Sequence, residues 1–241
     1  MINNLAIVTP MANESARAVE FIESVLSETN TIQQVIHLVI LDQASKDNTR
    51  QILEGYAKIE SRLHVVWAEE SCGIQDAYFR GYQEALKTGA DWILEIDAGF
   101  SHQPSDIQKF LEAASYSYDC VFGSRFCADA LFENHSIKRL IISKGGTLLV
   151  NLLLGTRLTD MTGGYQMFSR SALSSILKRG LRSKGQFFQT EMRAYCHGLN
   201  ITEVPIHYIM TSNYVPTTAL LDGVRQLIHL TRLRLMSQLY L

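Results

Sequence analysis

Two carboxylates stand near the end of an apolar run in the middle of the chain, in the stretch WILEIDAGFSHQP at residues 92–104. Glu95 and Asp97 are two residues apart, so an extended backbone points both side chains to the same face of a sheet. Gly99 then breaks the strand. Open α/β sheets bind ligands at the C-terminal ends of their strands, so this pair could hold a cation or position a substrate. Taken alone, the stretch is equally consistent with a strand that ends in an Asx-type turn.

Strands and helices are expected to alternate along the first 125 residues. Short apolar runs predict strands at 5–9, 35–41, 63–67, 92–97 and 119–123, and segments with apolar residues at helical spacing lie between them. The runs are apolar throughout, which indicates a mostly parallel sheet covered by helices on both faces. The polar residues that end these strands would then meet at one crevice. They are Thr9, Pro10, Asp42, Asp97, Ser124 and Arg125.

The second half of the chain has a different pattern. Residues 137–154 form a strongly apolar segment, and DMTGGYQMFS at 160–169 places two glycines before an aromatic run. A helix is expected over 187–197, a strand over 201–206 and a helix from about 217 to 241. No internal repeat, low-complexity stretch or Pro/Gly linker divides the chain. One domain with a C-terminal extension is therefore predicted.

Composition argues against several classes of function. The net charge of −2 over 241 residues gives no general attraction for nucleic acids. The four cysteines form no CxxC pair and have no histidine at zinc-finger spacing, so we expect reduced thiols in a cytoplasmic protein. The first residues, MINNLAIVTP, lack the basic segment of a signal peptide. No run of about 18 apolar residues predicts a membrane-spanning helix.

Several short motifs lie next to the expected strand and helix ends, and their order and spacing are typical of one enzyme family. They are PMANE at 10–14, DQASKDNT at 42–49, the small residues Gly73, Ala77, Gly81 and Ala85, DAGFSHQP at 97–104, GSRF at 123–126, Arg139 with Ser143, DMTGGYQ at 160–166 and EVPI at 203–206. Over residues 5–208 the chain resembles the inverting nucleotide-sugar glycosyltransferases of the GT-A type. It is most similar to their polyprenol-phosphate (dolichol-phosphate) mannose synthase branch.

The resemblance implies a Rossmann-like GT-A domain over residues 1–215, with a nucleotide-sugar half at 1–125 and an acceptor half at 126–215. An amphipathic helix would follow at 216–241. The implied reaction moves a sugar, usually mannose in this branch, from a GDP- or UDP-sugar to a polyprenyl phosphate or another lipid-linked acceptor with inversion. The protein would work in the cytoplasm, with a peripheral position at the cytoplasmic membrane face as an option.

The resemblance also assigns roles to individual residues. Asp97 matches the acidic residue that holds a divalent cation, Mg²⁺ or Mn²⁺, and Asp97 and Asp160 are the candidate catalytic residues. The family residues around the donor match Pro10, Glu14, Asp42, Gln43, Ala98 and Gly99. Those that meet phosphate groups match Ser124, Arg125, Arg139 and Ser143. Cations suit such a site because the donor diphosphate gains negative charge as the glycosidic bond breaks, and an Arg fork binds phosphate oxygens in pairs.

Departures from the family pattern concentrate on the donor and metal side. Ala12 and Gln43 replace a tyrosine and an aspartate, and Gly99 replaces the second aspartate of the metal motif. The basic RxxGxSK segment of the family corresponds here to TSNYVPT at 211–217. A single carboxylate is a weak Mg²⁺ site unless phosphate oxygens add ligands, so Asp97 is expected to bind metal weakly.

Two other functions remain open from the sequence. A transferase acting on a saccharide hydroxyl would need a general base, for which Asp160 and Glu191 are candidates. A non-catalytic relative would bind an anionic ligand without turnover. We expect His102 to be an ordinary loop histidine and the apolar stripe of 137–154 to pack in the core. The C-terminal helix is expected to pack on the domain, with docking at a membrane surface as the alternative.

Overall fold

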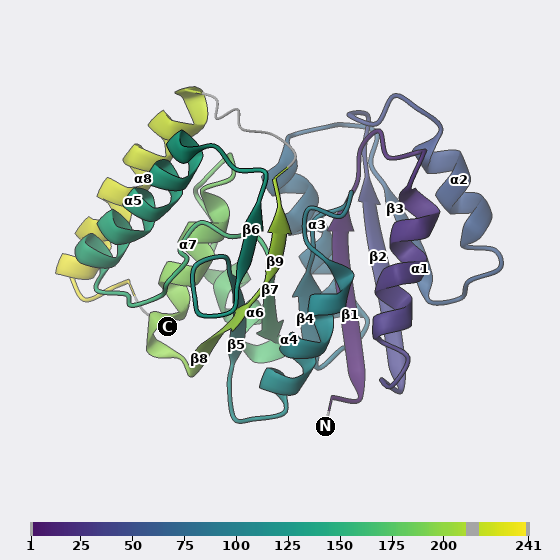
Figure 1. The fold of residues 1–241 in the computed structure, drawn as a ribbon, viewed down its shortest axis with the longest axis horizontal. Coiled ribbons are helices and arrows are strands. Elements are labelled where there is room, and N and C mark those ends of the chain that lie inside the picture. Colours follow the sequence, from purple (N-terminus) through teal and green to yellow (C-terminus); the bar gives the residue numbers. More distant parts are fainter. Residues whose placement is uncertain (1, 211–216, 240–241) are drawn as a thin grey trace.

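The computed structural model describes residues 2–210 and 217–239. A seven-stranded sheet lies between helices on its two faces, with a small two-stranded sheet beside it (Figure 1). The main sheet runs in the order β3 (Leu63–Trp67), β2 (Gln34–Leu41), β1 (Asn4–Pro10), β4 (Trp92–Glu95), β7 (Gln166–Ser169), β5 (Cys120–Ser124) and β8 (Ile201–Pro205). The small sheet pairs β6 (Leu131–Glu133) with β9 (His207–Ile209) in parallel.

Four neighbouring strands, β3, β2, β1 and β4, pair in parallel. Their C-terminal ends therefore open on the same edge of the sheet, as the sequence predicts. The strand order reverses at β1. The chain first adds β2 and β3 on one side of β1 and then adds β4 on the other side. A crevice at such a reversal is the usual ligand site of an open α/β sheet.

The two faces of the sheet pack into separate hydrophobic cores, because successive side chains of a strand point to opposite faces. On β1, Leu5 and Ile7 face one core, while Ala6 and Val8 face the other. The first core is covered by α1 (Ala18–Glu28), α2 (Thr49–Tyr56) and α4 (Ile107–Ala114). The second is covered by α3 (Ile74–Lys87), α5 (Ile137–Leu154), α6 (Arg170–Arg179), α7 (Phe188–Tyr195) and α8 (Thr217–Leu235).

The predicted α/β class is confirmed, but the second half departs from the prediction. β7 is antiparallel to both neighbours, and β6, β9 and α6 were not expected as separate elements. The C-terminal helix ends at Leu235. No helix among the described residues is both long and apolar enough to cross a membrane.

The expectation that the apolar stripe of α5 packs in the core is wrong for half of the helix. The inward face of α5 consists of Ser143, Thr147, Val150 and Leu154. The larger apolar side chains Ile137, Ile141, Leu148 and Leu152 are exposed. An apolar helix gives no sign in its sequence of which face is covered, so only the packing reveals this orientation.

The small-residue face of α3 lies close to the sheet, as its spacing predicts. Ala77, Gly81 and Ala85 are buried on one side of this helix. A Cβ atom on Gly81 would lie 2.3 Å from Cγ1 of Val8 and 3.0 Å from Cγ1 of Ile40. A glycine at this position therefore sets the distance between α3 and strands β1 and β2, which carry the edge of the crevice.

We expect Gly81→Ala to lower the free energy of unfolding by about 1–3 kcal/mol, because the added methyl group overpacks this contact. Gly55→Ala is the matched control, since Gly55 lies exposed in α2 with no heavy atom within 4 Å of an added Cβ. The control should raise stability by up to about 1 kcal/mol through helix propensity. Urea unfolding followed by circular dichroism measures both. Equal effects of the two substitutions would contradict the close approach.

Candidate active site

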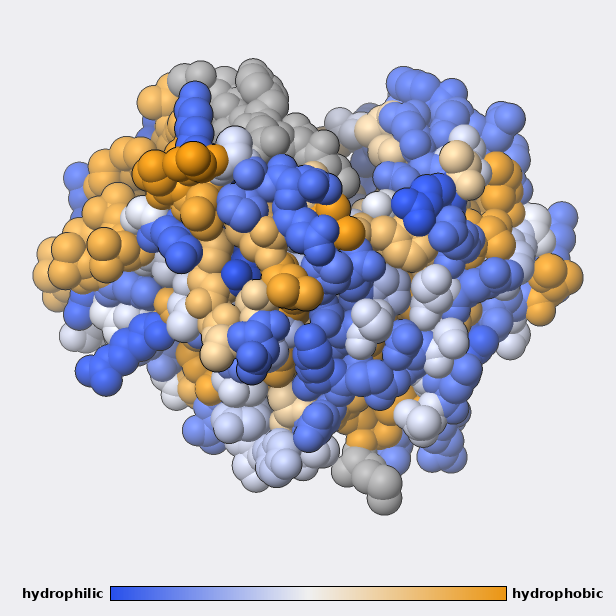
Figure 2. Space-filling model, viewed as in Figure 1, coloured by the Kyte–Doolittle hydropathy of each residue, from blue (hydrophilic) through white to orange (hydrophobic). Residues whose placement is uncertain are grey.

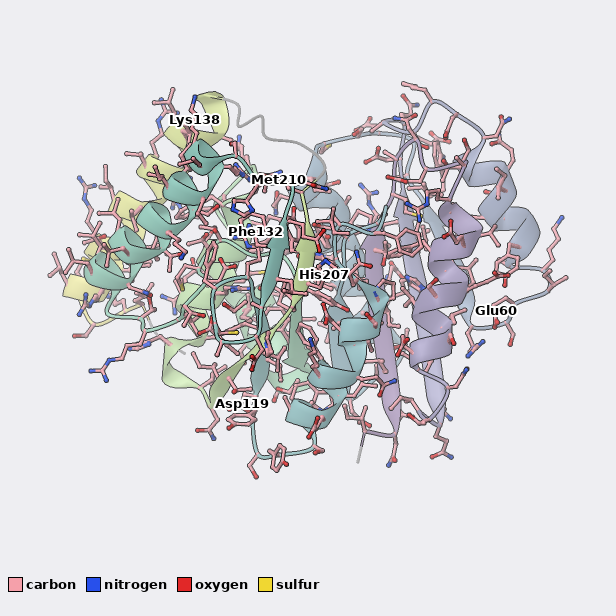
Figure 3. The ribbon with its side chains drawn as sticks, in the orientation of Figure 1. Glu60, Asp119, Phe132, Lys138, His207 and Met210 are labelled. Carbon is pink, nitrogen blue, oxygen red and sulfur yellow. The ribbon has the colours of Figure 1, made fainter. Side chains whose placement is uncertain are left out.

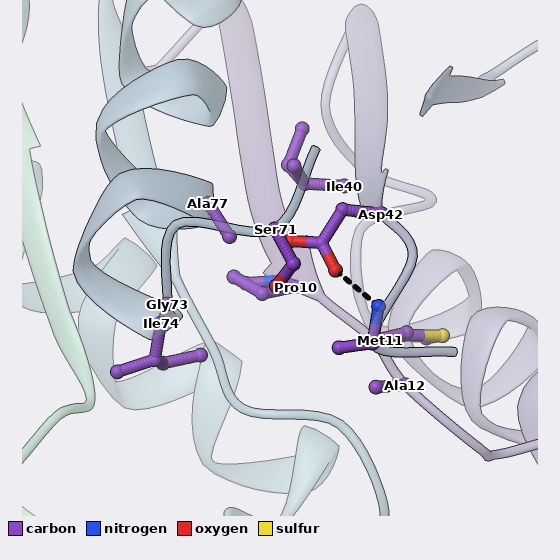
Figure 4. Close-up of a pocket in the computed structure, with 10 residues that line it drawn as sticks. Pro10, Met11, Ala12, Ile40, Asp42, Ser71, Gly73, Ile74 and Ala77 are labelled. Atoms are coloured by element: carbon purple, nitrogen blue, oxygen red, sulfur yellow. Dashed lines mark hydrogen bonds between the residues drawn. The ribbon is translucent and has the colours of Figure 1, made fainter. Parts of the chain in front are cut away.

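A first cavity, of about 190 Å³, opens at the C-terminal ends of β1 and β2 (Figure 4). Pro10 and Asp42 line it together with Met11, Ala12 and residues at the start of α3. The Asp42 carboxylate accepts a hydrogen bond of 2.8 Å from the backbone N–H of Ala44. Asp42 therefore forms the Asx turn and also lines a cavity at the strand ends. The small Ala12 side chain widens this cavity.

A second cavity, of about 70 Å³, lies beyond the end of β4 and brings together the predicted charged residues. Asp97, Arg125 and Arg139 all line it, and so do the predicted glycine turn at Gly163 and Gly164. These residues come from four separate segments of the chain. A Cβ on Gly164 would lie 2.2 Å from Nε2 of Gln189, so this position accepts only glycine without displacing its neighbour.

Asp97 is held from two sides. The Tyr78 hydroxyl of α3 donates a hydrogen bond to Oδ1 of Asp97. The backbone N–H of Asp97 donates to Nδ1 of His102 over 3.2 Å, so the proton of a neutral imidazole lies on Nε2. Burial lowers the pKa of His102, which keeps the ring neutral despite a distance of 3.6 Å between Nδ1 and Oδ2 of Asp97. Within residues 2–210 and 217–239, the second carboxylate oxygen of Asp97 therefore has no charged partner.

Arg125, which lines the second cavity, forms a buried ion pair with Asp160. The Nε and Nη2 atoms of Arg125 donate to the two Asp160 oxygens over 2.7 and 2.9 Å, and Nη2 also donates to Oγ1 of Thr162 over 2.7 Å. Burial by itself would raise the pKa of Asp160, but the charge of the Arg125 guanidinium and its hydrogen bonds hold that pKa well below the usual range. The rings of Phe132 and Tyr208 lie 5.4 Å from the Arg125 guanidinium. Phe132 stands on β6, next to β9 (Figure 3).

Arg139 differs from Arg125 in having no acidic partner in the described part of the chain. Its Nε–H is buried and finds no hydrogen-bond acceptor among the described residues. Burial first, and then the neighbouring Arg125 guanidinium, lower the pKa of Arg139. A cation in this position is destabilised until an anion arrives, because burial and a like charge both disfavour the charged form. The pair of guanidinium groups is therefore suited to an anion bound in the cavity.

A third cavity, of about 130 Å³, continues from the second between α5 and α8. Arg139, Thr162 and Gln186 line both cavities. Ser143 lines only the third cavity, as does Leu220 of α8. A ligand that places a phosphate beside Arg139 could therefore extend toward the outer helices.

Glu95 faces the interior, one step back along the strand from Asp97. Its carboxylate is fully buried and accepts a hydrogen bond from the Tyr82 hydroxyl. It also accepts from the Nε2 atoms of Gln166 and Gln189, over 2.8 Å in both cases. Burial raises the pKa of Glu95 to about 8 against these bonds. Gln189 also lines the second cavity, so Glu95 supports the wall of that cavity. The prediction that Glu95 and Asp97 share one face is confirmed, since both accept from tyrosines of α3.

Comparison with known proteins identifies the family. The model of Glycosyl transferase family 2 matches residues 6–177, which is most of the chain. The chain belongs to this family. The order of motifs in the sequence and the position of Asp97 at the crevice agree with that assignment.

Two curated relatives and one group of solved structures are similar to this family 2 transferase. The polyprenol monophosphomannose synthase of Mycolicibacterium smegmatis is 31% identical over 176 residues, which cover 72% of this chain and 66% of that protein. The undecaprenyl-phosphate mannosyltransferase of Micrococcus luteus is 34% identical over 174 residues, 71% of each chain. The chain thus spans about two thirds of the length of the first relative.

Glucosyl-3-phosphoglycerate synthase from Mycobacterium tuberculosis, solved with Mn²⁺, UDP and phosphoglyceric acid, superimposes with a TM-score of 0.66 at 18% identity. The superposition covers 96% of this chain and 78% of that one. At this level of identity the comparison establishes the shared GT-A fold. It confirms the predicted fold class.

The residues around Asp97 form an unfavourable set of ligands for the expected Mg²⁺ or Mn²⁺ ion. Among the described residues, no group of three or more His, Cys, Asp or Glu side chains could hold a metal ion. Gly99 adopts φ +75°, and a Cβ there would lie 3.1 Å from Oε1 of Glu14. The Glu14 carboxylate thus occupies the space of a second metal-motif side chain, while one oxygen of Asp97 is engaged by Tyr78. These residues do not fit a family-type metal site.

Three other predicted residues line neither the first nor the second cavity. Gln43 is exposed, and Ala98 is partly exposed in the loop after β4. Ser124 is buried, and its hydroxyl bonds to Thr159 over 2.6 Å and accepts from two backbone N–H groups at the end of β5. Most of the segment that corresponds to the basic family motif, residues 211–216, lies outside the described residues.

Neither candidate general base is placed to act. Asp160 is fully buried, and both of its oxygens accept hydrogen bonds from Arg125. Glu191 is also fully buried, where it accepts from two backbone N–H groups and from the hydroxyls of Ser183 and Tyr195. A general base needs access to the proton that it removes. The geometry thus gives Asp160 the role of holding Arg125, and gives Glu191 that of holding the loop before α7.

The structure adds residues that the sequence analysis did not assign to the site. His102 is 1% exposed and lines the second cavity, although a loop histidine was expected. Tyr78 and Tyr82 hold the two carboxylates of the opening stretch. The sequence spacing contains a signal for these tyrosines. Four residues of a helix rise about 6 Å and two residues of a strand about 6.6 Å, so two tyrosines four apart on a helix can reach two carboxylates two apart on a strand.

The raised pKa of Glu95 predicts a pH-dependent stability. Between the ordinary pKa of 4.5 and the folded value of about 8, the folded state holds a proton that the unfolded state releases. Stability should therefore fall as pH rises through this window, by up to about 1.4 kcal/mol per pH unit. Glu95→Gln should flatten this slope, as measured by urea unfolding between pH 5 and 8. An unchanged slope in the variant would show that another group titrates.

Proposed function

We propose that this transferase moves a sugar, with mannose as the first candidate, from a nucleotide-sugar donor to a polyprenyl phosphate with inversion at the sugar carbon. The single observation that carries the proposal is Arg139, a half-buried guanidinium without an acidic partner, in a cavity that continues between two apolar helices. A phosphate at the head of an apolar chain matches both parts of that environment. The names of the two curated relatives support the same acceptor class.

In this proposal the acceptor phosphate lies between Arg125 and Arg139, next to Ser143. One of its oxygens attacks C1 of the donor sugar, and the bond from C1 to the donor diphosphate breaks as the new bond forms. The diphosphate leaves with the electron pair of that bond, and the configuration at C1 inverts. An ionised phosphate is already a nucleophile, so the reaction needs no general base. This agrees with the position of Asp160, whose two carboxylate oxygens are both engaged by Arg125.

The donor would lie along the edge of the sheet from the first cavity to Asp97. Its nucleoside would occupy the cavity lined by Pro10 and Asp42, and either a GDP- or a UDP-sugar fits this proposal. The free oxygen of Asp97 would accept hydrogen bonds from hydroxyl groups of the sugar. The protein would act at the cytoplasmic face of the membrane that holds its acceptor.

Arg139→Ala should reduce kcat/KM for transfer to a polyprenyl phosphate by about 100-fold or more, because two charge-assisted hydrogen bonds of about 1.5–3 kcal/mol each are lost. The affinity for GDP or UDP should change little. Arg139→Lys should give an intermediate loss, since it keeps the charge but not the fork. Lys58→Ala, which removes an exposed cation outside α5, α8 and the cavities, is the control. Loss of nucleotide affinity with normal acceptor kinetics would place Arg139 on the donor side.

Calorimetry with GDP and UDP tests the donor site directly. Because Glu14 fills the space beside Gly99 and Tyr78 engages Asp97, binding should change by less than about threefold between Mn²⁺ and EDTA, unlike a site built on two carboxylate ligands. Asp42→Ala should weaken whichever nucleotide binds. No binding of either nucleotide under both conditions would rule out the proposed donor site.

A further inference from the structure

The large apolar side chains that the protein leaves exposed are concentrated on α5 and α8. Of sixteen such side chains among the described residues, ten belong to these two helices. They are Ile137, Ile141, Leu148, Leu149 and Leu152 on α5, and Leu220, Leu221, Val224, Ile228 and Leu235 on α8. The two helices lie side by side at one end of the molecule, where Figure 2 shows the apolar surface as a continuous orange area (Figure 1). We refer to these ten side chains as the α5–α8 face.

The α5–α8 face follows helical spacing on both of its helices. On α5 the most exposed positions are 137, 141, 148 and 152, which fall on one stripe of the helix. On α8, positions 220, 224, 228 and 235 form a second stripe. The opposite sides of the helices are the ones that pack on the domain, through residues such as Val150 and Leu230. The outer apolar stripes are therefore additional to the surface that the fold itself buries.

The two helices are fixed to each other. The Nη1 atom of Arg234 on α8 donates to the backbone carbonyl oxygens of Leu152 and Leu153 at the C-terminal end of α5, over 3.2 and 2.8 Å. These carbonyl groups lack partners within their own helix, and a cation is favourable at this end of the helix dipole. The α5–α8 face is thus a preformed surface, with both helices held in one layer.

Charge distinguishes this face from the rest of the molecule. The sequences of α5 and α8 contain six Lys and Arg residues and one acidic residue, Asp222, a net charge of +5, whereas the whole chain carries −2. Arg225 and Arg232 are exposed and flank the apolar stripe of α8. Lys144 is exposed within the stripe of α5, and Lys138 stands at the N-terminal end of that helix (Figure 3).

We propose that the α5–α8 face docks on a lipid bilayer with anionic head groups, with both helices parallel to the membrane plane. Apolar side chains on a basic helix insert about 5–10 Å into the head-group region, and nearby Lys and Arg side chains add attraction to anionic lipid. A second copy of the chain is the weaker occupant, because the four exposed Lys and Arg side chains beside one face would repel those of the other. The layer of exposed Leu and Ile side chains with basic neighbours matches a membrane surface.

This inference deepens the proposed function and rests on it for one point, the entry of the acceptor. Leu220 belongs to the α5–α8 face and also lines the third cavity with Arg139 and Ser143. A docked transferase would therefore hold its phosphate-binding cavity against the head groups. A lipid phosphate could reach Arg139 while its polyprenyl chain stays in the bilayer, so the long chain never has to enter water.

Sedimentation with vesicles tests the docking without any need for turnover. The wild-type protein should bind vesicles of phosphatidylcholine mixed with phosphatidylglycerol more tightly than vesicles of phosphatidylcholine alone. The double variant Leu148→Ser/Leu152→Ser should bind about tenfold or more weakly, since two apolar side chains that would enter the bilayer are lost. Arg225→Glu/Arg232→Glu should abolish the preference for anionic vesicles. Ile59→Ser, 81% exposed and remote from α5 and α8, should behave as wild type.

The outcomes that overturn the docking are equally direct. Wild-type protein that stays in the supernatant with anionic vesicles would overturn it, and so would normal binding by a correctly folded Leu148→Ser/Leu152→Ser variant. Ultracentrifugation in the absence of lipid gives the third test. A dimer that this double variant abolishes would assign the α5–α8 face to a second copy.

A pair of acceptors separates failure of the docking from failure of the proposed function. Leu148→Ser/Leu152→Ser should keep normal turnover of a short, water-soluble isoprenyl phosphate and lose turnover of a long-chain acceptor embedded in vesicles. If the wild type sediments with anionic vesicles but transfers sugar to neither acceptor, the proposed acceptor is wrong and the docking stands. Equal turnover of both acceptors by the variant would overturn the role of the face in acceptor entry.

Discussion

The buried ion pair between Arg125 and Asp160 is the interaction on which the rest of the site depends. It joins the end of β5 to the turn before β7, two segments that the sequence separates by 35 residues. The backbone N–H of Asp160 donates to Glu203 on β8, and its carbonyl oxygen accepts from Arg193 on α7. Burial makes such a pair expensive unless every lone pair and proton is used, and here both carboxylate oxygens are bonded.

Because Asp160 is paired with Arg125, it is not available to balance the charge of Arg139. Asp160 neutralises the first guanidinium, while the second stands beside it with a buried Nε–H that no described residue accepts. The cavity therefore carries a surplus positive charge at a fixed position, close to the carboxylate of Asp97. This separation of charge lets one small cavity accept an anionic group next to a polar sugar, which is the arrangement that a glycosyl transfer to phosphate requires.

The donor side of the crevice has been rebuilt around different contacts. Glu14 approaches the position of the missing carboxylate at residue 99, and Tyr78 holds the carboxylate that remains. Glu95 continues this arrangement inward through Tyr82 and Gln189, so the loop after β4 is supported from α3 and α7. The loop after β4, where the family pattern has a metal motif, is thus held by hydrogen bonds from tyrosine and glutamine side chains.

The sequence by itself determined the alternation of strands and helices in the first half and the parallel half of the sheet, and it singled out Asp97, Arg125 and Arg139. Apolar runs and strand-end polar residues are local patterns, and the parallel topology forces them to one edge. Only the tertiary structure decided that Asp160 binds Arg125 instead of acting as a base, that His102 lines the cavity, and that β7 runs antiparallel. These outcomes depend on contacts between distant segments. The tertiary structure also decided which side of α5 faces outward. The sequence shows only an apolar helix, and its packing against the domain shows which side remains uncovered.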